Sequence, residues 1–332
     1  MSGVGAPARL MRITGPRGSG KTVLLCDLRD RAIELGWKAV VVSAGPHLSH
    51  DLMEQIQDQL TFSSASLGVN VGIASAKLDI SSSEMSLRAK LKQIAQGSKG
   101  LFIAVDEVQD APVEEMRIIA STVQLLIGEK VNIALAFAGL PSGVMDLING
   151  KALTFLRRAV PEDLAPINQI EIALSLSDSF SATGLSLDGD LLSKAARATK
   201  GYAYLVQLVG YSIWQRANLH REKSTLVSER DVDEGILLAE ARFHDVVHEP
   251  AISGLSRNEI NYLYAMCEDS RQSKTSDLAK RLGKKTSELS SVRAKLLSRE
   301  VIQAPQRGYV QFAVPDLDEY LKDNIDEILS RY

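Results

Sequence analysis

The sequence predicts an α/β fold that begins with a parallel sheet and continues into an all-α domain and a C-terminal winged helix-turn-helix. Up to about Glu171, short apolar runs alternate with amphipathic stretches, which is typical of strands alternating with helices around a parallel sheet. Beyond Glu171 the strands stop, and three amphipathic helices are predicted. After Pro250 and the turn at Gly254, three helices precede two short β segments, which is the order of a winged helix.

Five short runs, most of them rich in Val, Ile or Ala, are the expected strands, as suits a sheet covered on both faces. They are Leu10–Ile13, Lys38–Ser43, Leu101–Val105, Val131–Ala138 and Gln169–Ile172. Four stretches between them carry apolar residues at helical spacing: Lys21–Leu35, His47–Leu60, Ser86–Ala95 and Pro112–Ile127. The stretch Phe62–Ser83 fits neither period. Because apolar and small residues alternate in Leu67–Ile80, we expect an inserted β-hairpin or a mobile loop there.

The second half of the chain is expected to be mainly helical. The predicted helices of the all-α domain are Gly189–Lys200, Tyr204–Asn218 and Glu229–Val246. The winged helix is predicted to contain helices Arg257–Glu268, Ser276–Leu282 and Ser287–Arg299, two β segments around Pro305–Gly308, and a closing helix Asp316–Leu329. The expected domain bounds are therefore 1–171, 172–249 and 250–332, which suits 332 residues because one ordinary domain has ~100–200.

Composition and charge exclude several classes of protein. With 45% hydrophobic and 24% charged residues, the chain is neither disordered nor membrane-spanning in type. The longest apolar stretch, Val131–Leu140, is shorter than the ~18–20 residues that cross a bilayer, and the N-terminus lacks the apolar run of a secretory leader. We expect a cytoplasmic protein without a membrane partner, and the lone Cys26 and Cys267 suit a reducing compartment. The net charge of -3 means that binding to nucleic acid would need a local basic patch.

A phosphate-binding loop is predicted at Gly15-Pro16-Arg17-Gly18-Ser19-Gly20-Lys21-Thr22, which matches G-x-x-x-x-G-K-[ST] in full between an expected strand and an expected helix. The glycines let backbone N–H groups close around phosphates, and the helix N-terminus adds partial positive charge. Lys21 is expected to reach the β- and γ-phosphates, and Thr22 to place its hydroxyl on Mg²⁺. We therefore predict that these residues and the adjoining Val23 bind ATP or ADP with Mg²⁺. The motif does not specify the residue type at position 17, so Arg17 could also be a solvated loop residue without a role in binding.

An acidic pair is the second part of the predicted site. The apolar run Leu101–Val105 ends in Asp106 and Glu107. Asp106 is expected to bind Mg²⁺ through water, and Glu107 to orient or deprotonate the attacking water. By itself such a pair is the common solvated end of a strand, but the loop at Lys21 favours the catalytic interpretation. The interval of about 85 residues leaves room for the elements that must intervene before a strand adjacent in the sheet.

Two further segments are weaker candidates. The next strand ends in Ala138-Gly139-Leu140-Pro141-Ser142, where only Ser142 or the backbone could sense a γ-phosphate. Arg157 and Arg158 lie near the end of a predicted helix that leads into the last strand, and they are candidates for a catalytic arginine that acts on a neighbouring subunit's ATP. The alternative, that both arginines simply stabilise a helix C-terminus or bridge carboxylates, stays open.

The winged helix carries a basic patch in a chain that is acidic overall. Between Arg271 and Arg307 there are ten basic residues and only three acidic ones, Asp277, Glu288 and Glu300. Helix Ser287–Arg299 is expected to lie in a major groove, with the wing tip near backbone phosphates. The expected contacts with double-stranded DNA come from Lys284, Lys285, Ser287, Ser290, Arg293 and Arg307. Winged helices also serve as protein-docking modules, so a protein partner is the alternative.

In their order along the chain, these motifs make the sequence resemble AAA+ ATPases of the origin-recognition and replication-initiator group. The resemblance covers nearly the whole chain. It rests on GPRGSGKT at Gly15–Thr22, LFIAVDE at Leu101–Glu107, AGLPS at Ala138–Ser142, FLRR at Phe155–Arg158 and TKGYAYLVQLVGYSIW at Thr199–Trp214. The resemblance implies a P-loop NTPase sheet of the AAA+ (ASCE) type with a helical lid, ATP held between sheet domain and lid, and self-association across the nucleotide.

Two departures from that family's pattern bear on activity. The fourth strand is followed by no clear polar sensor, and the lid segment Gly201-Tyr202-Ala203-Tyr204 lacks the arginine that many such lids direct at the γ-phosphate. Slow or partner-activated hydrolysis is therefore expected.

Two functions compete. The first is an ATP-switched protein that acts on DNA in replication initiation, plasmid or phage maintenance, or transposition-type target selection. The second is a regulatory NTPase of the STAND type, in which the nucleotide gates assembly and the winged helix packs against protein. A small-molecule kinase is disfavoured because the region past Glu171 is not typical of a phosphate-acceptor site. The pathway, the oligomeric state and any DNA sequence are beyond what these residues indicate.

Overall fold

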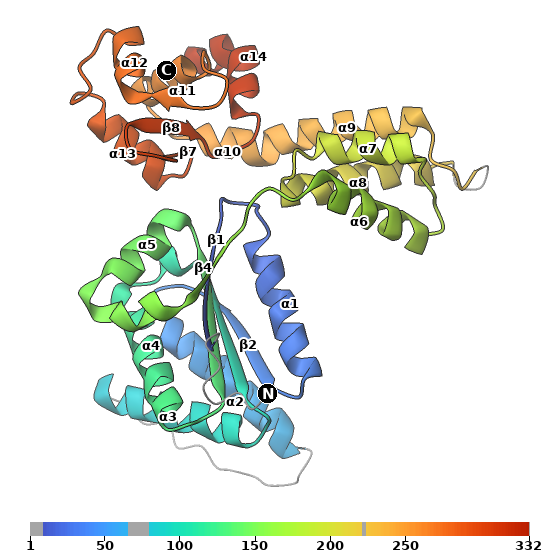
Figure 1. Cartoon of the computed structure of the whole chain (residues 1–332). Helices are drawn as coiled ribbons and strands as arrows, with labels where there is room; N and C mark the ends of the chain where they lie inside the picture. Colours follow the sequence, from blue (N-terminus) through green and yellow to red (C-terminus); the bar gives the residue numbers. More distant parts are fainter. Residues whose placement is uncertain (1–8, 66–79, 221–223, 332) are drawn as a thin grey trace. The chain divides into compact units, whose positions relative to one another are not determined.

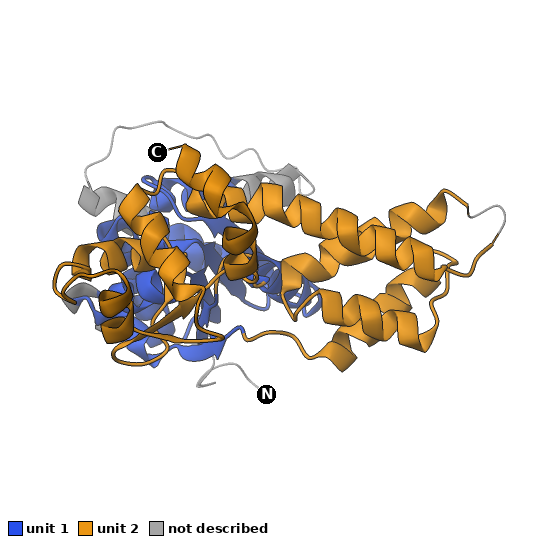
Figure 2. Cartoon of the chain, turned by 90° about the horizontal axis from the view of Figure 1, so that it is seen from above, with its two compact units in different colours: residues 1–15, 20–164 blue, residues 16–19, 165–332 orange. Residues whose placement is uncertain are grey.

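The computed structural model describes residues 9–65, 80–220 and 224–331, and the chain divides into two compact units (Figures 1 and 2). The first unit runs up to Gly15 and from Gly20 to Leu164. The second holds Pro16–Ser19 and the chain from Ala165 onward. No helix in the described parts of the chain is both long and apolar enough to cross a membrane.

The first unit is built on a five-stranded sheet in the order β2-β3-β4-β1-β5, and every pair of neighbours is parallel. The strands are β1 Leu10–Thr14, β2 Lys38–Ser43, β3 Leu101–Asp106, β4 Ile133–Gly139 and β5 Val160–Asp163. In register, Thr14 lies beside Gly139, and Ser43 lies beside Asp106. The carboxyl ends of β1, β3 and β4 therefore meet at one edge of the sheet, where the candidate site lies.

Alternation along the strands assigns side chains to two layers of helices. On β3, Leu101, Ile103 and Val105 face one core, while Phe102 and Ala104 face the other. Helix α1 (Lys21–Glu34) covers the side with the smaller residues (Figure 1). The other side is covered by α2 Leu48–Ala65, α3 Ile80–Gln96, α4 Val113–Gly128 and α5 Pro141–Asn149.

The predicted strand Gln169–Ile172 is wrong, because those residues begin helix α6 (Gln169–Ala182). The side chain of Asn168 accepts a hydrogen bond from the Ile170 N–H at 2.8 Å and caps this helix. Ile170 and Ile172 fit strand alternation, but Ile172 also shares a buried helical face with Leu176 and Phe180. The fifth strand is instead β5, which contains a proline, as its position at the edge of the sheet permits.

The strand order and the Phe62–Ser83 insertion also differ from the predictions. The acid-bearing strand β3 is not adjacent to β1, because β4 lies between them. The insertion predicted at Phe62–Ser83 is helical at its ends, where Phe62–Ala65 belong to α2 and Ile80–Ser83 to α3. Its centre, residues 66–79, lies outside the described residues.

In the second unit, a group of four helices follows the sheet domain, one more than the sequence predicts. They are α6, α7 Gly189–Ala198, α8 Ala203–Asn218 and α9 Glu229–Phe243. Helix α9 begins with a capping box between Ser228 and Asp231. It approaches α8 closely at Gly235, where a Cβ would lie 2.7 Å from the Cα of Ile213. These helices bury one shared apolar core.

The C-terminal part of the second unit has its own core and the predicted winged-helix order. Its helices are α11 Arg257–Met266, α12 Thr275–Arg281, α13 Ser290–Ser298 and α14 Leu317–Ser330. The sheet has three short strands in the order β6-β8-β7, namely β6 Ser273–Lys274, β7 Ile302–Gln303 and β8 Tyr309–Phe312. Strand β6 was not predicted, since two residues carry too little periodicity to be read. Gly308, at φ 85°, closes the turn between β7 and β8.

A short π-helix, η4 (His244–His248), and the short α10 (Glu249–Ile252) follow α9, and His248 is fully buried there. Its Nε2 lies 2.7 Å from the Pro315 carbonyl, which can only accept, so Nε2 carries the proton. Nδ1 is buried without a hydrogen-bond partner in the described structure. Burial, the largest cause, lowers the pKa of His248 from 6.5 to about 4.

We expect His248 to make the second unit less stable in acid. Between pH 6.5 and about 4 the unfolded imidazole binds a proton that the folded one refuses, so the free energy of unfolding falls as the pH falls through this window. The contribution is complete above pH 6.5 and amounts to at most about 3–4 kcal/mol, at about 1.4 kcal/mol per pKa unit. The measurement is the urea midpoint followed by Trp214 fluorescence in a Trp37→Phe background. His248→Gln, which keeps a donor for Pro315 but cannot titrate, should flatten the pH dependence. Parallel curves for the two proteins would show that His248 is not the titrating group.

Candidate functional site

The loop at Gly15–Thr22 joins β1 to α1 and takes a conformation that depends on its glycines. Gly18 and Gly20 have φ of 72° and 96°, in the left-handed region that favours glycine. Lys21 is the first residue of α1 and is 4% exposed. Its Nζ donates a 2.9 Å hydrogen bond to the Gly15 carbonyl. The loop therefore holds a buried ammonium group at the N-terminus of a helix, where anions are favoured.

Polar groups in the loop suit an oxygen-rich ligand. The Ser19 N–H donates to the Pro16 carbonyl at 3.2 Å. The Ser19 hydroxyl is buried and has no hydrogen-bond partner among the described residues. A buried hydroxyl left unpaired is costly, and a ligand oxygen would satisfy it. Val23, on the first turn of α1, is 59% exposed.

Thr22 and Asp106 meet across the carboxyl edge of the sheet. The Thr22 hydroxyl donates a 2.5 Å hydrogen bond to Asp106 Oδ2, and Asp106 Oδ1 accepts from the Glu107 N–H at 2.9 Å. Asp106 is 4% exposed. Because the hydroxyl proton is given to the carboxylate, a lone pair of Thr22 Oγ1 stays available to a cation. This hydroxyl and carboxylate are the hard oxygen donors that Mg²⁺ prefers, so the donor set fits that ion.

Glu107 is held in an unusual backbone conformation. Its φ of 52° and ψ of 45° are left-handed, and it begins a single 3₁₀ turn, η2 (Val108–Asp110). Conformations of this kind persist in non-glycine residues only where the surroundings over-determine them. Gln109 donates from Nε2 to Glu107 Oε2, and Gln109 Oε1 accepts from the Leu140 N–H at 3.1 Å. Gln109 is not among the site residues predicted from the sequence, although a polar residue two positions after the acidic pair was a visible signal.

The two candidate catalytic arginines have different surroundings. Arg157 donates from Nε to the Ile148 carbonyl at 2.9 Å and from Nη2 to the Asn149 carbonyl at 3.2 Å. It therefore stabilises the C-terminus of α5, as the alternative interpretation expected. Arg158 is exposed and has no hydrogen bond or ion pair with any described residue. The proposal of a catalytic arginine therefore rests on Arg158.

In the second unit, the tip of the phosphate-binding loop is bonded to the start of α8. The Tyr202 hydroxyl donates to the Arg17 carbonyl, and the Tyr204 N–H donates to the Gly18 carbonyl at 3.1 Å. Burial raises the pKa of Tyr202 to about 12, so the hydroxyl keeps its proton. From the sequence, only the absence of an arginine in this segment was evident, and the tyrosine that contacts the loop was missed.

On the winged helix, part of the predicted basic patch is neutralised. Arg281 donates from Nη1 and Nη2 to Asp269 at 2.6 and 2.7 Å, and Lys295 pairs with the buried Glu259 at 2.8 Å. Lys284 contacts Asn258 at 3.3 Å.

The other predicted DNA contacts stay accessible to differing degrees. Ser287 lies in the turn before α13 rather than in the helix, and it accepts from the Ser290 hydroxyl at 2.7 Å. Exposed basic side chains of this segment that form no ion pair with a described residue include Lys274, Lys285 and Arg307, and half-buried Arg293 also lacks one.

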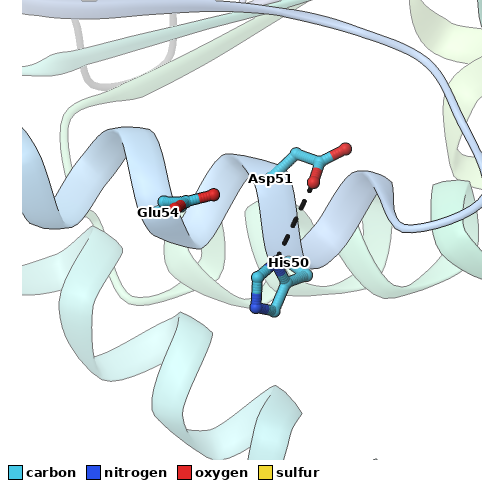
Figure 3. Close-up of side chains that lie close together, drawn as sticks. All are labelled: His50, Asp51 and Glu54. Atoms are coloured by element: carbon cyan, nitrogen blue, oxygen red, sulfur yellow. Dashed lines mark ion pairs between the residues drawn. The ribbon is translucent and has the colours of Figure 1, made fainter.

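A separate cluster lies on α2 (Figure 3). One ligand atom from each of His50, Asp51 and Glu54 lies within 4.8 Å of the other two, and His50 Nδ1 lies 3.8 Å from Asp51 Oδ1. All three side chains are exposed and come from one helix. Nothing else in the described structure points to an ion there, so we assign the cluster no function.

Solved structures with the same fold cover nearly the whole chain. The Walker-type ATPase PABY2304 of Pyrococcus abyssi has a TM-score of 0.68 at 14% identity, over 95% of this chain and 91% of that one. The Aeropyrum pernix ORC2 protein, in ADPNP–ADP complexes, has a TM-score of 0.64 at 15% identity, over 99% and 90%. Cdc6p from Pyrobaculum aerophilum has a TM-score of 0.51 at 15% identity, over 97% and 87%. The chain therefore has the fold of AAA+ P-loop ATPases, including the initiator-like group, as predicted.

Other comparisons add little about activity. Residues 245–321 match the family described as "Domain of unknown function (DUF8462)". The sequence matches no curated protein.

Replacing Gly18 by Ala is expected to destabilise the second unit by about 1–3 kcal/mol. Left-handed φ costs an L-residue roughly 1 kcal/mol, and the new Cβ would lie 2.4 Å from the Tyr202 hydroxyl oxygen. In a Tyr202→Ala background the contact is removed, so only the cost of about 1 kcal/mol from φ should remain. Urea midpoints of the four proteins measure this cycle.

Gly189→Ala is the matched control, because no atom lies within 4 Å of the position that its Cβ would take and its φ is not left-handed. A Gly18→Ala penalty that is unchanged in the Tyr202→Ala background would refute the contact.

Proposed function

We propose that this chain binds ATP with Mg²⁺ at Gly15–Val23, hydrolyses it slowly, and uses the nucleotide state to control binding of duplex DNA by its winged helix. The proposal rests mainly on the buried Lys21 beside a Thr22 hydroxyl bonded to Asp106. The AAA+ fold supports it, and so do the adenine nucleotides named for the ORC2 structure.

The proposed roles follow from the charges and hydrogen-bonding capacity of each residue. Backbone N–H groups of the loop and the Lys21 ammonium bind the phosphate tail, and Ser19 donates its unpaired hydroxyl proton to a phosphate oxygen. Thr22 and Asp106 would hold Mg²⁺, and the ion would offset the negative charge of the phosphates. Glu107 orients the attacking water and accepts its proton. Arg158 is proposed to stabilise charge on a neighbouring subunit's ATP.

We propose that the winged helix binds duplex DNA through basic side chains that have no carboxylate partner. Exposed Lys274, Lys285 and Arg307, with half-buried Arg293, offer cations that are not neutralised by described carboxylates. Cations of this kind bind backbone phosphates and release counterions.

One observation favours the alternative, a STAND-type NTPase whose winged helix docks protein. Because Arg281 and Lys295 are tied to Asp269 and Glu259, the available positive charge is smaller than the sequence count. The binding experiment below separates the two functions.

The nucleotide site is tested by two substitutions. Lys21→Ala removes the buried ammonium group and is expected to weaken binding of Mg²⁺-ATP by about 100-fold or more, because charge-assisted contacts are worth about 1.5–3 kcal/mol each. Glu107→Gln keeps the shape and is expected to retain binding while kcat falls by roughly 10²–10⁴-fold. Isothermal titration calorimetry measures the affinity for Mg²⁺-ATP, and phosphate release measures kcat.

The exposed lysine Lys38, in the same unit, provides a control as Lys38→Ala, which should change neither quantity. Saturable ATP binding by the Lys21→Ala protein with wild-type affinity would refute the phosphate site. Turnover by the Glu107→Gln protein at the wild-type rate would refute only the role of that carboxylate.

The DNA proposal is tested by Lys285→Ala/Arg293→Ala. If these side chains contact phosphates, duplex affinity should fall about 10-fold or more, and the slope of log K against log salt should shrink by about 2. Fluorescence anisotropy would be measured with ADP, with a non-hydrolysable ATP analogue and without nucleotide.

Lys38→Ala/Lys322→Ala removes the same charge from two exposed positions and should leave DNA binding unchanged. Absence of duplex binding by the wild-type protein at low salt would exclude the DNA function and favour protein docking. Equal losses in both double variants would indicate a general charge effect instead of a DNA-binding face.

A further inference from the structure

Gln109 forms a bridge between the ends of two strands. Its amide donates to the Glu107 carboxylate, just beyond β3, and accepts from the Leu140 N–H, just beyond β4. One end of the bridge meets an acceptor and the other a donor. Among side chains of this length only a glutamine amide satisfies both, since a glutamate cannot donate when ionised and a lysine cannot accept.

The position of Gln109 is shaped by the absence of two side chains. A Cβ on Gly139 would lie 2.6 Å from Gln109 Oε1, and a Cβ on Gly143 would lie 2.5 Å from Gln109 Cβ. Neither glycine has a left-handed φ, so their backbone conformations do not require glycine. The space that they leave is therefore needed for the Gln109 side chain.

The bridge engages only one oxygen of the Glu107 carboxylate. Gln109 bonds Oε2, while Oε1 accepts no hydrogen bond from the described residues. A contact that sequestered the carboxylate would cover both oxygens. A carboxylate fixed through one oxygen and open at the other is instead suited to accept a proton from a bound water.

We infer that Gln109 is a positioning residue that orients the Glu107 carboxylate towards the attacking water, and that it ties this orientation to the end of β4. The inference rests on the proposed ATP hydrolysis. Gln109, in the turn after β3, also places a polar side chain at the end of β4. The residues of the strand itself there, Ala138 and Gly139, have no polar side chain.

Two substitutions of Gln109 test the role. Gln109→Glu keeps the acceptor for Leu140 but sets a second carboxylate against Glu107, and Gln109→Met keeps the packing and removes both hydrogen bonds. In each, kcat for Mg²⁺-ATP is expected to fall about 10- to 100-fold, as for a misplaced general base, while KM and the dissociation constant of ATP stay within about twofold. Asp110→Asn, at the exposed neighbouring position, is the control and should turn over at the wild-type rate.

The possible outcomes are separable. If the wild-type protein hydrolyses ATP and both Gln109 variants keep its kcat, or exceed it, the positioning role is overturned while the proposed function stands. A fall in kcat accompanied by an equal loss of ATP affinity would also overturn it, because it would indicate a general disturbance of the site. Failure of the wild-type protein to turn over ATP would overturn the hydrolytic function itself. Circular dichroism shows whether both variants are folded. If Gln109→Glu does not fold, the kcat of Gln109→Met tests the positioning role by itself.

Discussion

The hydrogen bond between Thr22 and Asp106 is the interaction on which the candidate site depends. It joins the first turn of α1 to the end of β3, although β4 lies between β3 and the strand that leads into the loop. Parallel strands make this possible, because their carboxyl ends share one edge of the sheet and bring distant parts of the sequence together. A hydroxyl that donates to a buried carboxylate also keeps a lone pair for a cation. The contact that joins Thr22 to Asp106 can therefore persist when a metal ion binds.

Around that bond, the site is built from small residues that leave space and polar residues that fill it. Gly18 and Gly20 permit the left-handed turns of the loop, whereas Gly139 and Gly143 leave room for Gln109. The left-handed Glu107 is the strained element of this arrangement. The Glu107 backbone begins the short turn η2, and Gln109 within that turn donates a hydrogen bond to the Glu107 carboxylate. The strained backbone and the hydrogen bond therefore belong to one short segment.

The residues that could be predicted are those whose role depends on local sequence. The loop, the acidic pair, four of the five sheet strands and the winged-helix order each follow from a motif or a periodicity. The strand predicted at Gln169–Ile172 failed because four residues are too few to separate alternation from a helical face, and the cap at Asn168 decided the outcome. Gln109 and Tyr202 escaped prediction because their roles depend on contacts with Leu140 and the loop tip, which only the folded chain brings within reach.

Charge counts alone also misjudge the winged helix, because side chains paired within the fold are not available to a partner. A sequence count treats every Lys and Arg in Arg271–Arg307 as available to a partner, yet the exposed Lys295 is already paired with the carboxylate of the buried Glu259. Removing one partner of such a pair leaves an uncompensated charge and lowers stability, so those arginines and lysines are poor probes of binding. The informative cations are the ones that the fold leaves without a carboxylate, Lys285 and Arg307 among them. Whether this surface meets phosphate or protein then depends on how these few charges are spaced, because part of the segment's positive charge is already neutralised within the fold.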